Sequence, residues 1–156
     1  MRKGIHNVFG KQALVQRCQW HKRKNVIAYL PKSQQEIFRK KLQKAYKQKS
    51  YKKVKQELTS IRKELNLLNQ SAVNSLDEGL EETLTLHRLG MFEFLGISLK
   101  TTNCLESLNS QLEQYTRRVS YWKNSNQRQR WVATALLEIE PNLRKIKGYK
   151  HLPLLR

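Results

Sequence analysis

Apolar residues recur every three or four positions along much of the chain, which is the spacing of a helix that buries one face. The clearest stripe lies in residues 51–68, where the steps between apolar residues are four, three, four and three. The stripe consists of Val54, Leu58, Ile61, Leu65 and Leu68. Because the other faces of this segment are rich in lysine, the pattern predicts an amphipathic helix.

Similar segments flank this stripe on both sides. Before it, Ser33 and Glu36 have the spacing of a capping box, which predicts the start of a helix. The apolar face of that helix is expected to carry Ile37, Leu42, Ala45 and Tyr46. After the stripe, residues 71–89 predict a third helix, which Gly79 weakens in its middle. Its inward positions are Val73, Leu76, Leu80 and Leu84.

The N-terminal segment differs from these helices. Residues 13–18 are apolar and follow a turn signal, so they predict a short buried strand. Residues 21–30 predict a helix that ends at Pro31. The inward face of this helix carries Val26, Ile27 and Leu30.

The C-terminal half begins with a break over residues 90–102, within which the apolar residues 91–95 are expected to dock on the core. A helix over residues 103–119 follows, and after a polar connection a short apolar helix runs to Pro141. The expected buried face of the helix over residues 103–119 carries Leu105, Leu108, Leu112, Tyr115 and Val119. The fold class is therefore predicted to be mainly α, with a small α/β remnant.

The net charge of the chain indicates which class of molecule it binds. The chain of 156 residues has 31 Lys and Arg against 12 Asp and Glu, a net charge of +19, and Asp77 is its single Asp. Such an excess favours nucleic acid as the partner, with an anionic membrane surface second. No apolar run approaches the roughly 20 residues of a membrane span. Two cysteines make no disulfide framework, so we expect a cytoplasmic protein.

The first candidate for chemistry is a C-x-x-H motif formed by Cys18 and His21. A structural zinc site needs four ligands, and the other candidates stand at no standard spacing. They are Cys104, His6, His87 and His151. We therefore favour a structural role, in which Cys18 closes the strand and His21 caps the following helix.

The second candidate is Glu106. With Asn103 as N-cap, Glu106 takes the third helical position of a capping box, which is a purely structural role. In the alternative, Glu106 is a ligand for Mg²⁺, an ion that binds through one or two carboxylates. The residues alone favour the capping box.

The third candidate is a basic stretch interleaved with aromatic residues near the C-terminus. Guanidinium and ammonium groups neutralise phosphates, and exposed rings stack on bases. The candidate DNA-binding residues are Arg117, Arg118, Trp122, Lys123, Arg128 and Arg130. The lysine-rich helices over residues 39–55 offer an equally basic surface.

Together these motifs resemble the Mutator-type transposases of bacterial insertion sequences. Residues 16–26, which read QRCQWHKRKNV, match the family pattern Q-R-C-x-x-H-K-x-x-N-V. Residues 99–109, which read LKTTNCLESLN, match a later T-T-N-x-x-E-S/R-x-N block that includes Asn103 and Asn109. Residues 78–90 and the segment after Arg117 continue the resemblance in the same order, over essentially the whole chain.

The resemblance implies an RNase H-like catalytic domain with a DDE carboxylate triad that uses Mg²⁺ or Mn²⁺ for DNA strand cleavage and transfer. Glu106 would be the third catalytic acid and a metal ligand, and Cys18 and His21 would have an architectural or DNA-related role. The corresponding domains are a partial RNase H-like segment over 1–31, a helical insertion over 32–98, the helices over 99–140 and a basic tail over 141–156.

The chain departs from the family at the two aspartates. The family pattern places the second Asp three residues ahead of the Gly that matches Gly4, a position before Met1, and the first lies further upstream. We therefore predict a truncated, C-terminal portion of a nucleoid-associated bacterial transposase that is inactive alone. The expected partners are DNA and full-length transposase or a second copy, and not a membrane. The alternatives are a non-catalytic DNA-binding or regulatory fragment and a degenerate gene product.

Overall fold

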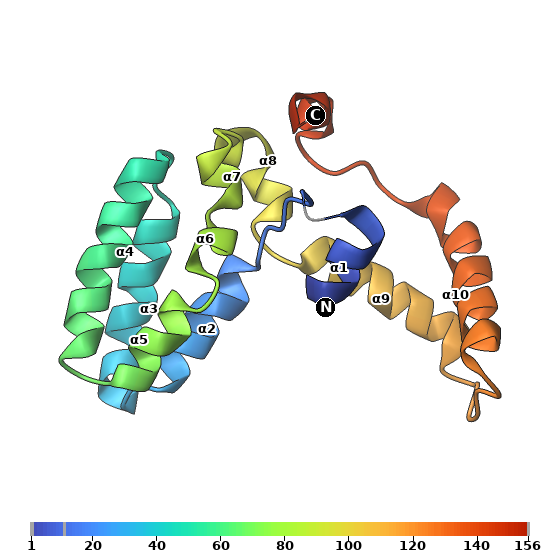
Figure 1. Ribbon diagram of the computed structural model, residues 1–156, viewed down its shortest axis with the longest axis horizontal. Helices are drawn as coiled ribbons and strands as arrows, with labels where there is room; N and C mark the ends of the chain where they lie inside the picture. The colour runs from blue at the N-terminus through green and yellow to red at the C-terminus, as the bar shows by residue number, and fades with distance from the viewer. Residues whose placement is uncertain (1, 11, 156) are drawn as a thin grey trace.

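The computed structural model describes residues 2–10 and 12–155 and is mainly α. Along its long axis, helices α2 to α5 form one end, α6 to α8 lie in the middle, and α9 and α10 form the other end (Figure 1). Within the described ranges no segment is a strand, so the predicted α/β remnant is wrong as far as these residues go. In the same ranges, each helix is too short or too polar to cross a bilayer.

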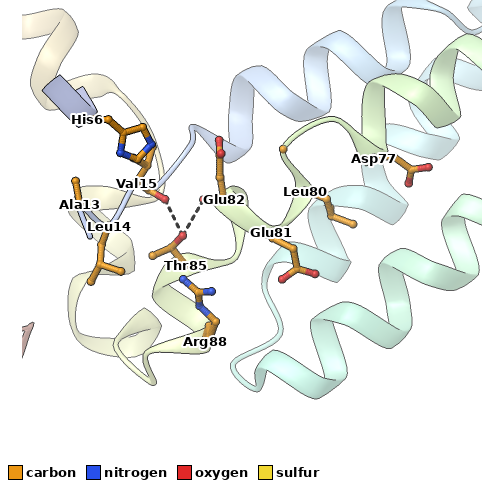
Figure 2. A pocket seen from close by; sticks show the side chains of 11 residues that line it. His6, Ala13, Leu14, Val15, Asp77, Leu80, Glu81, Glu82, Thr85 and Arg88 are labelled. Atoms are coloured by element: carbon orange, nitrogen blue, oxygen red, sulfur yellow. Dashed lines mark hydrogen bonds between the residues drawn. The ribbon is translucent and has the colours of Figure 1, made fainter. Parts of the chain in front are cut away.

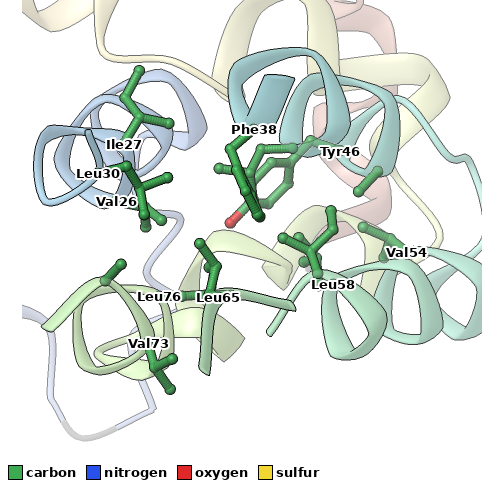
Figure 3. Packing of buried hydrophobic residues seen from close by; sticks show 14 of the residues in the cluster. Val26, Ile27, Leu30, Phe38, Tyr46, Val54, Leu58, Leu65, Val73 and Leu76 are labelled. Atoms are coloured by element: carbon green, nitrogen blue, oxygen red, sulfur yellow. The ribbon is translucent and has the colours of Figure 1, made fainter. Parts of the chain in front are cut away.

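Four helices share the main hydrophobic core: α2 (Gln19–Ala28), α3 (Lys32–Tyr46), α4 (Tyr51–Asn66) and α5 (Gln70–Asp77). Figure 3 shows their apolar side chains meeting between the helices. The stripe predicted for α4 is confirmed, because Val54, Leu58, Ile61 and Leu65 are all buried. Leu68 is half-exposed, since α4 ends two residues before it.

The start of α3 differs from the prediction. The helix begins at Lys32, directly after Pro31, so Ser33 lies inside the first turn and no side chain caps this end. The capping box of Ser33 and Glu36 is therefore wrong. The buried face is also rotated by one residue, because Phe38 is buried and Ile37 is exposed. The other expected residues of that face, Leu42, Ala45 and Tyr46, are buried.

The single helix predicted over residues 71–89 is three separate helices. After α5, the chain turns through Gly79, which has a φ of +64°, and continues as α6 (Leu80–Thr83) and α7 (Thr85–Arg88). A left-handed residue cannot continue a right-handed helix, and glycine adopts this conformation at little cost. The expected inward residues Val73, Leu76 and Leu84 are nevertheless buried.

The segment predicted as a buried strand, residues 13–18, is extended but pairs with no strand in the described ranges. It lies along α6 and α7 instead: the Arg17 N–H donates to Glu82 O at 2.9 Å. Figure 2 shows the Thr85 hydroxyl between the carbonyl oxygens of Val15 and Glu82, to which it is 2.7 and 3.2 Å distant. Helix termini and hydroxyl groups thus satisfy backbone groups that a neighbouring strand would otherwise pair.

The expected break over residues 90–102 contains helix α8 (Phe92–Leu99). Met91 and Leu95 are buried as expected, but they pack with Leu86 in a second, smaller cluster and not in the main core. The C-terminal 3₁₀-helix Tyr149–Leu155 closes this cluster through Leu155. Figure 1 shows the C-terminus near α8.

Helices α9 (Asn103–Thr116) and α10 (Ser125–Ile139) lie side by side as a hairpin (Figure 1). The buried face predicted for α9 is wrong, because this helix buries none of its residues and Leu105 is 60% exposed. Helix α9 packs against α10 and α8, and this packing leaves Leu108, Leu112 and Val119 half-buried. The predicted polar connection before residue 131 is in fact the first part of α10, which the Asn124 side chain caps by accepting from the Gln127 N–H at 2.9 Å.

Candidate functional site

The segment around the C-x-x-H motif is held against α6 by two glutamines. Gln16 donates through its amide nitrogen to Thr83 O at 2.9 Å, and its amide oxygen accepts from the Leu86 N–H at 3.0 Å. Gln19 is buried and also donates to Thr83 O at 2.9 Å. Because buried amides require such partners, these two residues fix the position of the motif relative to α6 and α7.

Two cations strengthen the same contact. Arg17 forms two 3.1 Å hydrogen bonds with one Glu78 carboxylate oxygen, and this contact holds the pKa of Glu78 below its usual value. Lys22 is almost fully buried, and its ammonium group donates to the carbonyl oxygens of Ser75 and Glu78. Burial lowers the pKa of Lys22, and the nearby Glu78 carboxylate partly offsets this effect.

Within the motif, Cys18 is the N-cap of α2. Its sulfur accepts from the His21 N–H at 3.5 Å and lies 3.0 Å from His21 Nδ1. The prediction that His21 caps the helix is therefore wrong, since the cap is the cysteine. The half-exposed imidazole is left facing outward from the first turn of α2.

The start of α9 meets this turn. The Gln19 N–H donates to Lys100 O at 2.9 Å, which ties α2 to the residues just before α9. The Thr102 hydroxyl donates to Glu106 Oε1 at 2.6 Å and lies 3.3 Å from His21 Nδ1, and Glu106 Oε1 is 3.8 Å from His21 Nε2. We call Cys18, His21, Thr102 and Glu106 the Glu106 cluster.

The single proton of the Thr102 hydroxyl fixes the direction of these bonds. An ionised carboxylate only accepts, so the hydroxyl proton is directed at Glu106 and the hydroxyl oxygen is free to accept from His21 Nδ1–H. Both the imidazole and the carboxylate are about half exposed. The cluster therefore presents an oriented carboxylate to solvent, with its orientation set from two elements.

The capping box predicted for Asn103 and Glu106 is wrong. Helix α9 starts at Asn103 itself, with Thr102 in the N-cap position. In the described structure the Glu106 carboxylate accepts from the Thr102 side chain, and the Glu106 N–H donates to Thr102 O at 2.8 Å. The Glu106 carboxylate therefore does not take part in a capping box with Asn103, and its oxygens can accept from or bind a further partner.

The described residues do not assemble a zinc site. Cys18 and His21 are in contact, but the other candidate ligands are engaged elsewhere: Cys104 with Ser98 O, His87 with Gln48 O, His151 with the Phe94 ring and His6 with Gly10 O. Across the described ranges, no group of three or more His, Cys, Asp and Glu residues is placed to hold a metal ion. Asp77 is paired with Arg62 at 2.8 Å.

The predicted DNA-binding residues lie at the other end of α9 and along α10. Arg117 is the C-cap of α9, about 16 Å from Glu106 at the helical rise. Trp122 and Trp131 meet edge to face with ring centroids 6.3 Å apart, and the Arg128 guanidinium lies 6.0 Å from the Trp122 ring. The remaining DNA-binding candidates, Arg118, Lys123 and Arg130, are exposed. The motif residues Asn103 and Asn109, which have no assigned role, are also exposed and belong to α9 itself. The structure thus keeps the DNA-binding candidates apart from the Glu106 cluster.

Sequence reasoning did not single out Thr102 or Arg23, which both face this region. Thr102 appeared only as a letter in the T-T-N motif, because a hydroxyl role depends on which side chains fold next to it. A polar residue within an otherwise apolar contact, such as the buried Gln19, was the available signal that this segment docks on another element.

Comparison with known proteins agrees with the motifs. The family model described as "Transposase, Mutator family" matches residues 1–145. No curated protein and no solved structure matches the chain. Since the family match covers nearly the whole sequence, the resemblance drawn from the motifs is confirmed, and the chain belongs to the Mutator family of transposases.

Proposed function

We propose that this chain contributes the third catalytic carboxylate, Glu106, to an RNase H-like transposase centre that cuts and joins insertion-sequence DNA. The observation that carries the proposal is the Glu106 cluster. His21 and Thr102 are 81 positions apart in the sequence, yet the fold brings the two family motifs that contain them into contact. A contact of this kind is expected if both motifs serve one site.

The proposed ions are Mg²⁺ or Mn²⁺, and Glu106 would hold one of them. An exposed carboxylate that accepts a hydrogen bond from the Thr102 hydroxyl suits these hard cations, which prefer oxygen ligands. When bound, such ions supply Lewis-acid stabilisation of the phosphoryl group. The chain's own contribution is to orient Glu106 through Thr102 and to hold Thr102 next to His21.

We further propose that the chain is inactive by itself. This proposal is supported by the pairing of Asp77 with Arg62, and by the lack of a group of three or more His, Cys, Asp and Glu residues placed to hold a metal ion among the described residues. In this proposal the two further carboxylates come from another chain. A full-length transposase or a second chain would supply them. The exposed apolar face of α9, which includes Leu105, is a suitable surface for a sheet of such a partner.

A complementation assay tests this proposal. The purified 156-residue chain is mixed with a full-length relative whose own catalytic glutamate is replaced by glutamine, together with element-end DNA and Mg²⁺ or Mn²⁺. We expect cleavage only in the mixture, and none when the added chain carries Glu106→Gln. Cleavage by the chain alone contradicts the proposed inactivity, and equal cleavage with Glu106→Gln contradicts the role of Glu106.

A non-catalytic regulatory role is the second candidate. It is favoured by the same partly uncovered face of α9, which would let the chain occupy a place in a transposase assembly without completing its site. In that case the chain inhibits an active full-length transposase in proportion to its concentration and gives no cleavage in the mixture described above.

A further inference from the structure

A small cavity of about 80 Å³ lies beside the Glu106 cluster, between α2 and the C-terminal part of α3. Its lining includes Trp20 and Arg23 from α2, Tyr46 and Lys47 from the end of α3, and Lys100 and Thr101 from the segment before α9. None of the residues that line the cavity is acidic. Its volume is far below the roughly 300–1,000 Å³ of sites that enclose a whole small-molecule ligand, so it fits a single small group.

The Arg23 side chain lines this cavity and lacks a hydrogen-bond acceptor for its Nε among the described residues. This Nε is also shielded from solvent. Burial lowers the pKa of the Arg23 guanidinium, and the groups that oppose this shift are Tyr46 and Cys18, with no carboxylate among them. The Arg23 side chain as a whole is only partly buried, but a shielded guanidinium N–H without an acceptor favours an anion beside it.

The neighbouring residue shows the contrast. Lys22 is more deeply buried than Arg23, but two carbonyl oxygens accept from its ammonium group and the Glu78 carboxylate lies 3.8 Å away. Arg23, the next residue of α2, lines the cavity, and its Nε receives no such acceptor from the described residues. An anion bound in the cavity would supply the acceptor that Arg23 Nε lacks.

Two more basic residues line the same cavity. Lys47 is the C-cap of α3 and Lys100 is the C-cap of α8, and no ion pair joins either to a carboxylate of the described residues. Gln19 fixes the backbone of Lys100 through its N–H, so this arrangement is part of the contact that builds the Glu106 cluster. Tyr46, whose pKa burial raises to about 12, remains a neutral hydroxyl in the wall.

We infer that this cavity is a phosphate-binding site, and that its occupant is one backbone phosphate of a DNA strand lying next to the Glu106 cluster. The identity of the occupant rests on the proposed function. Arginine and lysine donors around a tetrahedral oxyanion are the usual protein partners of phosphate. Arg23 is then a positioning residue, because it holds the strand next to Glu106 without contacting the reacting atoms.

Salt-dependent DNA binding tests the inference on the full chain. Arg23→Gln removes the charge, and Lys24→Gln is the matched control because it removes the same charge from an exposed neighbour outside the cavity. We expect Arg23→Gln to weaken duplex binding roughly tenfold. It should also reduce the slope of log affinity against log salt by about 0.9, the value for one phosphate contact in B-DNA. Lys24→Gln should leave the slope unchanged.

The outcomes separate this inference from the proposed function. If the unaltered chain binds DNA and the two variants behave alike, the cavity inference is overturned and the proposed role of Glu106 is unaffected. If the unaltered chain alone does not bind DNA, the cavity inference is overturned, and the complementation assay decides the proposed role of Glu106 separately. Thermal melting with inorganic phosphate at constant ionic strength distinguishes the source: a stabilisation that depends on Arg23, combined with unchanged DNA binding by Arg23→Gln, overturns the assignment to DNA.

A folding control completes the test. Arg23→Gln breaks no hydrogen bond of the described structure, so its melting temperature should be no lower than that of the unaltered chain. If this variant nevertheless fails to fold, Lys100→Gln, at another residue that lines the cavity, takes its place in the binding assay. We expect Lys100→Gln to weaken duplex binding as well, by less than the tenfold expected for Arg23→Gln. A Lys100→Gln variant that binds DNA as Lys24→Gln does would then overturn the inference.

Discussion

Arg17 passes so close to Gly79 that a Cβ atom on Gly79 would lie 2.1 Å from Arg17 Nη1. Gly79 also has a positive φ, so any other L-residue there is strained even without the contact. The turn between α5 and α6 and the docking of the C-x-x-H segment therefore depend on the same glycine.

Gly79→Ala should destabilise the chain. The left-handed backbone costs about 1 kcal/mol for a residue with a Cβ, and displacement of Arg17 from Glu78 adds to that. Urea unfolding followed by circular dichroism measures the change. Gly4→Ala is the control, since Gly4 is in a helix with no heavy atom within 4 Å of its Cβ position, and it should be neutral or slightly stabilising.

The main core should carry most of the stability. Leu58 is 1% exposed at the centre of the α4 stripe, so Leu58→Ala is expected to cost about 2–5 kcal/mol in the free energy of unfolding. Leu67 follows α4 and is 86% exposed, so Leu67→Ala should change stability by less than about 0.5 kcal/mol. Equal effects of the two substitutions would contradict the packing described for α4.

Removing the Thr102 hydroxyl should impair Glu106 without unfolding the chain. Thr102→Val leaves the carboxylate without the donor that orients it, and loss of such a supporting hydrogen bond costs roughly tenfold or more in activity at metal sites. The measurement is cleavage in the complementation assay. Thr102→Ser keeps the donor and should retain most activity, so equal activity of the two variants would contradict the orienting role.

Stability should fall as the pH is lowered from about 7.5 to about 5.5 because of His87. Its ring is buried against Phe92, with Nδ1 lacking a hydrogen-bond partner among the described residues, and burial lowers the pKa of His87. The unfolded chain then binds the proton more readily than the folded one, so stability is lost as the pH falls through the ordinary histidine pKa.

Urea unfolding at the two pH values measures this loss, and His87→Gln should reduce it. Glu78 and Glu81 do not interfere, because Arg17 lowers the pKa of Glu78 and Lys55 lowers that of Glu81, so both titrate at lower pH. An unchanged pH dependence in His87→Gln would assign the effect to other groups.

The α9–α10 hairpin is expected to bind DNA through phosphates. Replacing Arg117 and Arg118 together with glutamine should reduce the slope of log affinity against log salt by about 2, if each contacts one phosphate of a duplex. Electrophoretic mobility shifts at several salt concentrations measure the slope. Lys24→Gln again serves as the control, and an unchanged slope in the double variant would remove these residues from the DNA surface.

The sequence predicted the α2–α5 core well, because each of its helices buries a face whose period is visible in the chain. The stripe of α4 is the clearest case. The same reasoning was wrong for α9, whose stripe is equally regular but only partly covered, since periodicity indicates that a face is apolar and not what lies against it. The break at Gly79 was noted only as a weakness, because the sequence does not show that this glycine takes the left-handed conformation beside Arg17.

The candidate site was predicted residue by residue but not as an assembly. Cys18, His21 and Glu106 were each named from motifs, and each also had a structural interpretation that the residues alone could not exclude. Their contact depends on hydrogen bonds between segments far apart in sequence, such as Gln19 with Lys100. Arg23 was missed because an unpaired cation is recognisable only when its surroundings are known.

The bond between Gln19 and Lys100 also has a topological consequence. The chain departs into the helical core from the first turn of α2 and comes back to that same turn before α9 begins, so the intervening helices form a loop that is closed at its base. The length of a connection far from this base, such as the one between α3 and α4, therefore does not change the positions of the residues in the Glu106 cluster. Related chains can therefore gain or lose residues there while their two motifs stay in register.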